Sequence, residues 1–83
     1  MQKHIKNWLY SRGKLVDDFF FCEKCGQSTD TMLHIHHIKF RSDQGTDDAD
    51  NLIMLCEECH KKAQKRAISD EVLFAVAKRF ILK

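Results

Sequence analysis

The sequence predicts a small α+β domain fastened by a bound metal ion, and three observations support this fold class. Four cysteines form two Cys-x-x-Cys pairs, Cys22/Cys25 and Cys56/Cys59. Two short segments with the composition of strands lie before the second pair, and helix-forming segments flank them on both sides. The chain has only 83 residues, and a core of that size gives marginal stability, so a cross-link between distant segments is expected.

The two cysteine pairs supply the four thiolates of a closed tetrahedral zinc site. We therefore expect a structural Zn²⁺ held by Cys22, Cys25, Cys56 and Cys59, with two disulfides as the alternative. The first residues, MQKHIKNWLY, lack the apolar core and cleavage site of a signal peptide, and no transmembrane run follows. These absences favour a cytoplasmic, reducing location, where paired cysteines bind metal more often than they form disulfides.

The N-terminal third is expected to contribute a helix and core residues. Residues 2–12 favour a short helix, because Ile5 and Trp8 lie at helical spacing and Gly13 can end it. The three phenylalanines at 19–21 form an apolar run directly before the first cysteine pair. We expect all three in the core around that pair.

A strand is expected over residues 32–38, with the sequence MLHIHHI. Side chains alternate along a strand, so His34 and His36 share one face and His37 points to the other. Residues 40–51 are rich in Ser, Asp and Gly, and this composition indicates a surface loop.

The C-terminal half is expected to hold a second strand, over residues 52–56, and two helices. The segment from Glu57, EECHKKAQKRA, favours the first helix. Ser69 has the position of an N-cap, with two acidic residues in the turn that follows. The buried stripe of this last helix is expected at Val72, Leu73, Val76 and Phe80.

The charge distribution is more informative than the net charge, which is only +2. Basic side chains gather after the central histidines and after the second cysteine pair, and such local patches can attract phosphate groups. The alternative is an ordinary solvated helix surface. The residues concerned are Lys39, Arg41, Lys61, Lys62, Lys65 and Arg66.

Taken together, the strings CEKCG, LHIHHIKF and GTDDADNLIMLCEECH resemble the HNH nuclease family. That family carries a ββα-metal finger, which many members hold with four cysteines. The resemblance covers a core motif at 22–64 of what we expect to be a single domain, 1–83. It implies a metal-dependent DNA endonuclease that hydrolyses phosphodiester bonds, with flanking helices that complete the core and offer a dimer face.

The resemblance also assigns roles to individual residues. It implies that His37, the second member of the doublet, is the general base, a role suited to an imidazole with an ordinary pKa of about 6.5. His36 and His60 would bind the catalytic divalent cation, Mn²⁺, Ni²⁺ or Mg²⁺. Asn51 would pin the loop and orient the base. Gln64 stands where many relatives have a further histidine, and its amide oxygen would be a weaker ligand.

Three other interpretations stay open from the residues alone. The chain can be a non-catalytic zinc module that binds DNA or a protein, and one histidine of the doublet can be a zinc ligand. Cys56-Glu-Glu-Cys59-His60 also matches the pattern for covalent haem attachment, but that assignment leaves the first cysteine pair without a role. His4 and His34 have no place in the motif.

Overall fold

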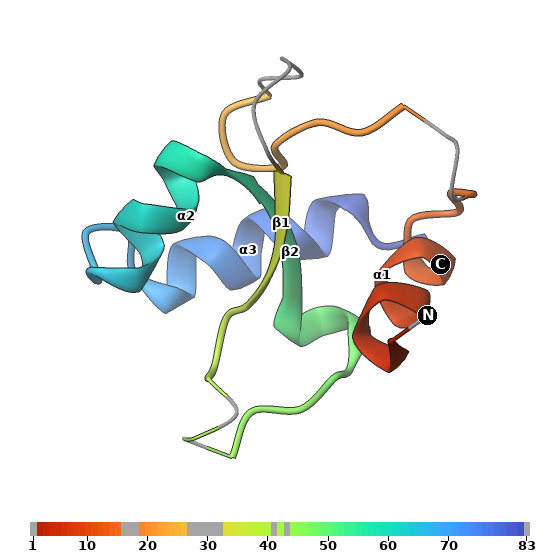
Figure 1. Ribbon diagram of the computed structural model, residues 1–83, viewed down its shortest axis with the longest axis horizontal. Coiled ribbons are helices and arrows are strands. Elements are labelled where there is room, and N and C mark those ends of the chain that lie inside the picture. The colour runs from red at the N-terminus through yellow and green to blue at the C-terminus, as the bar shows by residue number, and fades with distance from the viewer. Residues whose placement is uncertain (1, 16–18, 27–32, 41, 43, 83) are drawn as a thin grey trace.

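A computed structural model describes residues 2–15, 19–26, 33–40, 42 and 44–82. A two-stranded hairpin lies at the centre, with one helix on one side and two on the other (Figure 1). This arrangement confirms the expected small α+β fold. Among these residues no helix is long and apolar enough to cross a membrane. The elements are α1 (Lys3–Ser11), β1 (Leu33–His37), the 3₁₀ turn η2 (Ala49–Asn51), β2 (Leu52–Cys56), α2 (Glu57–Gln64) and α3 (Asp70–Phe80).

The hairpin is antiparallel, and its register runs from Leu33 opposite Cys56 to His37 opposite Leu52. Every residue of β2 is buried. A strand can be buried throughout only if both faces of its sheet are covered. The helices therefore enclose the hairpin from both sides, and β2 forms the centre of the molecule.

Two apolar clusters cover the two faces. On one face Trp8 of α1 packs against Leu52 and Met54. On the other face Ile53 and Leu55 pack with side chains of α2 and α3 and with three of the cysteines. The full second cluster is Cys22, Ile38, Ile53, Leu55, Cys56, Cys59, Ala63, Leu73 and Ala77.

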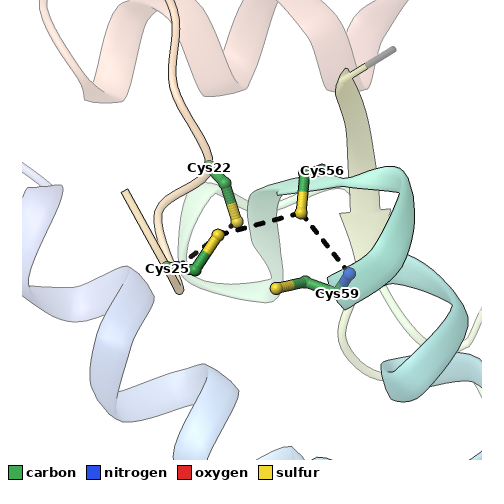
Figure 2. Close-up of side chains that lie close together, drawn as sticks. All are labelled: Cys22, Cys25, Cys56 and Cys59. Carbon is green, nitrogen blue, oxygen red and sulfur yellow. Dashed lines mark hydrogen bonds between the residues drawn. The ribbon is translucent and has the colours of Figure 1, made fainter. Parts of the chain in front are cut away.

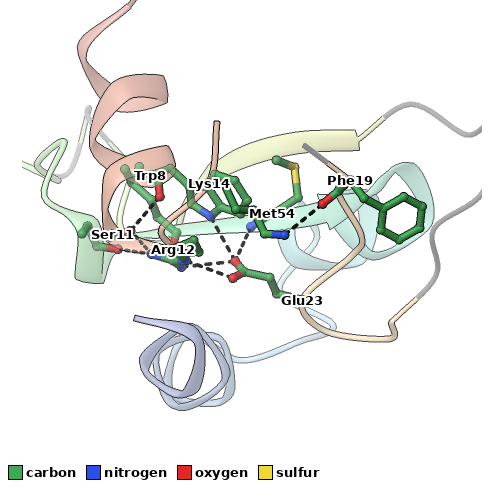
Figure 3. A network of polar contacts seen from close by, with 9 residues as sticks. Trp8, Ser11, Arg12, Lys14, Phe19, Glu23 and Met54 are labelled. Atoms are coloured by element: carbon green, nitrogen blue, oxygen red, sulfur yellow. Dashed lines mark hydrogen bonds and ion pairs between the residues drawn. The ribbon is translucent and has the colours of Figure 1, made fainter. Parts of the chain in front are cut away.

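A buried polar network around the ion pair of Arg12 and Glu23 connects α1 to β2 (Figure 3). Arg12 Nε donates to Glu23 Oε2 at 2.9 Å, and both side chains are only 2% exposed. Glu23 also accepts hydrogen bonds from Trp8 Nε1 at 3.1 Å and from the backbone N–H of Met54 at 2.8 Å, while Arg12 donates to the carbonyl of Leu52 at 2.7 Å. Removing one partner of such a pair leaves a buried charge, so the network fixes how α1 sits on β2.

The two C-terminal helices begin where the sequence predicts, but the end of α2 and the buried face of α3 differ from the prediction. Ser69 caps α3, because its hydroxyl accepts the backbone N–H of Val72 at 3.3 Å, as expected. The expectation that Val72 is buried is wrong: it is 43% exposed, and Leu73 and Ala77 form the buried line instead. The helix predicted from Glu57 stops early, since α2 ends at Gln64.

The phenylalanine run divides between core and surface. Phe20 packs edge-on against Trp8 at 5.8 Å between ring centroids, and Phe21 packs against Phe80 at 5.6 Å. Phe19 is 68% exposed, so the expectation that all three belong to the core is wrong. Three consecutive side chains cannot all face the same core, and the first one turns to solvent.

Candidate functional site

The four cysteines converge in space, as Figure 2 shows. Their sulfur atoms all lie within 4.8 Å of one another, and none is in a disulfide. Cys25 Sγ and Cys56 Sγ are 3.8 Å apart. A tetrahedral site with Zn–S bonds of about 2.3 Å places its sulfurs about 3.8 Å apart, whereas a disulfide needs about 2.05 Å. The cysteines are therefore positioned to bind one metal ion, and the cluster fits zinc.

Each half of this cluster is a local turn closed by its own backbone. The N–H of Cys25 donates to Cys22 Sγ at 3.4 Å, and the N–H of Cys59 donates to Cys56 Sγ at 3.5 Å. Gly26 follows the first pair with φ of +81°, a conformation that glycine adopts at little cost. Cys56 is at the same time the N-cap of α2, and its sulfur accepts the backbone N–H of Cys59 in the first turn of that helix.

The pKa values of the thiols are also consistent with a bound cation. Burial acts to raise the pKa of Cys22, but hydrogen bonds from the backbone of Cys25 and Cys56 outweigh it and lower the pKa to about 7. Burial and the neighbouring thiols raise the pKa of Cys59. Four crowded sulfurs cannot all ionise without a counter-charge, and a bound divalent cation supplies that charge because it binds the thiolate form.

A second group of side chains gathers where β1 meets α2. The rings of His36 and His60 are 5.2 Å apart between centroids, and His34 stacks on His60 at 4.5 Å. His34 and His36 therefore share the side of β1 that faces α2, as strand alternation predicts. The contact of His34 with this group was not expected from the motif, although its i, i+2 spacing from His36 pointed to it.

Both metal-ligand candidates are neutral at pH 7. Burial, followed by the nearby His60, lowers the pKa of His36 to about 4. Burial and then His34 lower the pKa of His60. A neutral imidazole keeps the nitrogen lone pair that a cation needs, so the environment of this pair fits a divalent ion.

A cavity of about 280 Å³ opens over these histidines. It unites the candidates from β1 and α2, and Gln64 lies one helical turn beyond His60 at its edge. The cavity is lined by Ile35, His36, His37, Phe40, His60 and Gln64.

His37 points to the opposite side of β1 and is held there by a carboxylate. Its Nε2 lies 2.8 Å from Asp47 Oδ1, and the backbone carbonyl of Asp47 accepts a hydrogen bond from Asn7 Nδ2 of α1 at 2.8 Å. An ionised carboxylate can only accept, so Nε2–H donates, and Nδ1 carries the lone pair when the ring holds a single proton. Asp47 was not expected from the sequence, because its loop carries several aspartates and nothing in the pattern distinguishes this one.

Asn51 pins the loop that precedes it. Its side-chain oxygen accepts the N–H of Lys39 at 2.8 Å, and its amide donates to the carbonyls of Lys39 at 3.1 Å and Thr46 at 2.8 Å. These bonds join the end of β1 to the residue just before Asp47. Among the described residues, His37 Nε2–H donates its side-chain hydrogen bond to Asp47, and Asn51 makes none with that ring.

The basic residues differ in their exposure and in their contacts. Lys39, Lys61, Lys62 and Lys65 are exposed, and Arg41 falls outside the described residues. Arg66 binds Asp70 with two hydrogen bonds of 2.7 and 2.9 Å and lies 4.6 Å above the ring of Phe40. It is thus fixed at the rim of the cavity, whereas the α2 lysines extend into solvent.

Comparison with known proteins shows to which family this chain, with its four-cysteine cluster and histidine-lined cavity, belongs. The family model described as HNH endonuclease matches residues 22–66, more than half of the chain, and the chain belongs to that family. It is similar to the Type IV methyl-directed restriction enzyme EcoKMcrA of Escherichia coli (strain K12), with 29% identity over 65 residues. The match covers 70% of this chain but only 22% of that enzyme. No solved structure matched the chain. Family membership and this relative together support a nuclease.

Proposed function

We propose that this chain is a metal-dependent endonuclease that hydrolyses DNA phosphodiester bonds, with His37 as the general base. The observation that carries the proposal is the single cavity that collects His36, His37 and His60. Within β1, His36 faces α2, which carries His60, whereas His37 faces α1, so we assign cation binding to His36 and His60 and proton transfer to His37.

Asp47 supports the assignment of His37. Its carboxylate holds Nε2–H at 2.8 Å and fixes the ring's tautomer. The lone pair on Nδ1 can then accept a proton from an attacking water. Asp47 acts through His37, so we regard it as a positioning residue.

His36 and His60 are the residues that would hold the catalytic cation, and Gln64 at the edge of the cavity would complete the set. A divalent cation supplies charge neutralisation at the scissile phosphate and at the leaving oxygen. Two neutral imidazoles leave positions open for phosphate and water. Mn²⁺ and Ni²⁺ suit these ligands better than Mg²⁺, which prefers oxygen.

DNA is the proposed partner because exposed lysines adjoin the cavity residues along the chain, Lys39 next to Phe40 and Lys61 next to His60. Phosphate contacts are expected from Lys39, Arg41, Lys61, Lys62, Lys65 and Arg66. One finger has one active centre and cuts one strand per encounter. Cleavage of both strands would take a homodimer or a second encounter.

The test is cleavage of supercoiled plasmid by purified protein with Mg²⁺, Mn²⁺, Ni²⁺ or EDTA. His37→Ala should lower the rate by about 10²–10⁴, the usual range for a general base, while DNA binding persists. Tyr10→Ala is the matched control, because Tyr10 is exposed on α1, and it should cut at the parent rate.

The rival function is a non-catalytic zinc module that binds DNA or a protein. It predicts DNA or protein binding with no cleavage under any cation. An active His37→Ala variant would instead show that the base has been assigned to the wrong residue.

A further inference from the structure

A second set of ligand atoms lies on the α1 side of the hairpin. His4, His37 and Asp47 each offer one ligand atom, and these atoms all lie within 4.8 Å of one another. The three residues come from α1, β1 and the loop before η2. His4 has no part in the proposed reaction, yet α1 brings its ring to 5.1 Å from that of His37, between centroids.

The geometry of this trio is set by tertiary contacts. All three residues are half-buried, and His37 Nε2 is 2.8 Å from Asp47 Oδ1. Asn7, one turn after His4 on α1, donates to the backbone of Asp47 at 2.8 Å. That bond ties the helix carrying His4 to the loop carrying Asp47, so the donors are held together before any ion binds.

The donor set has the chemistry of an open zinc site. Two imidazoles and one carboxylate, with a fourth position for water, form a known class of zinc coordination. Imidazole nitrogens also select zinc and its neighbours over Mg²⁺. We propose that His4, His37 and Asp47 form a zinc-binding site, separate from the cysteine cluster and from the His36/His60 pair, and that zinc bound there switches off the nuclease.

The switch follows from the two nitrogens of one ring, and this part rests on the proposed function. Without the ion, neutral His37 carries its proton on Nε2, donates it to Asp47 and keeps its lone pair on Nδ1. Zinc on Nε2 uses the lone pair of that nitrogen, so the single ring proton moves to Nδ1 through solvent. No proton is gained or lost, but Nδ1 becomes a donor and can no longer accept a proton from water.

The two histidine sites can be distinguished because only one of them includes His4. His36 pairs with Ile53, on the face covered by α2 and α3, while His37 pairs with Leu52, on the face covered by α1. His4 and His60 nevertheless line one cavity, so the two sites are neighbours and differ in their ligands: His4 belongs to the proposed zinc site and His60 to the other. A change at His4 should affect only the first.

The experiment titrates the ¹⁵N-labelled full chain, with its tightly held zinc in place, with further Zn²⁺. The ring nitrogens of His4 and His37 should shift, and calorimetry should show one zinc fewer for His4→Ala than for the parent. Lys6→Ala, an exposed neighbour on α1, is the matched control and should bind as the parent does. In plasmid cleavage at fixed Mg²⁺, His4→Ala should need at least about tenfold more zinc for half-inhibition.

Unmoved ring nitrogens of His4 and His37 in the parent would overturn the site, whether or not the variants fold. An unchanged zinc count in His4→Ala would do the same. Parent and His4→Ala inhibited at equal zinc would overturn the switch. If no cleavage occurs under any cation, the proposed nuclease function fails, and the switch with it, while the ring-nitrogen shifts and the zinc count still decide the site.

Discussion

The cysteine cluster and the histidine cavity are built from the same hairpin and differ in how they are closed. Cys22, Cys56 and Cys59 are buried, and their sulfurs lie within 4.8 Å of one another and of Cys25 Sγ, which together make the four ligands that a tetrahedral ion needs. His36, His37 and His60 line an open cavity of about 280 Å³. A closed ligand set stabilises a fold, and an open one leaves room for chemistry. The number of ligands and their access to solvent, more than the type of ligand, therefore distinguish the structural cluster from the proposed catalytic one.

The two regions also differ in what holds their residues in place. Each cysteine pair is closed by a bond between residues three apart, so local sequence suffices. The histidines depend on the register between β1 and β2 and on contacts from α1. Damage to the first region should remove the fold, and damage to the second should remove activity from an intact fold.

The largest effect is expected from Cys56→Ser. Cys56 is a metal ligand candidate and the N-cap of α2, so the variant should lose its metal and unfold, because the binding energy of a structural zinc is largely folding energy. Circular dichroism and elemental analysis measure both. His60→Ala is the control and should keep its fold and its zinc. A soluble, folded Cys56→Ser protein, or a folded parent without zinc, would break the distinction between the regions.

A smaller loss of stability is expected from Glu23→Ala. The variant leaves Arg12 buried without its partner and removes the acceptor of Trp8 and Met54, so the free energy of unfolding should fall by about 3–5 kcal/mol. Urea unfolding measures it. Glu57→Ala breaks the exposed 3.7 Å ion pair with Lys61 and should cost under about 1 kcal/mol. Equal losses in the two variants would show that the buried network contributes no more than a surface pair.

The smallest effect is expected from Gln64→His, which adds an imidazole at the cavity edge. It should tighten Mn²⁺ binding by about tenfold, equivalent to about 1.4 kcal/mol. The unfolding midpoint of the protein without added Mn²⁺ should stay unchanged. The parent should accordingly lose activity on dialysis and regain it with Mn²⁺ or Ni²⁺. Calorimetry with Mn²⁺ decides the matter, with Gln64→Ala beside it. If all three proteins bind Mn²⁺ alike, Gln64 does not contact the ion.

The sequence predicted those parts of the molecule that local pattern determines. The cysteine spacing, the alternation of His36 and His37 and the Ser69 cap each depend on residues within one turn or one strand, and the structure confirms the resulting elements. Asp47 and His4 were missed because their relation to His37 arises only when α1 and the loop fold onto β1. Glu23 was missed for the same reason. It reads as an ordinary acidic residue between two cysteines until the fold buries it against Arg12.

The buried ion pair of Arg12 and Glu23 has a consequence for the size of the working unit. The family match begins at Cys22, yet the partner of the very next residue lies in the segment just after α1. A fragment that begins at the start of the match would lack Trp8 and Arg12. Leu52 and Met54 would then be exposed, and the Glu23 carboxylate would lose its partner beside an apolar cluster. The sequence motif that identifies the family is therefore shorter than the segment expected to fold. A fusion protein that carries this finger should include α1 as well.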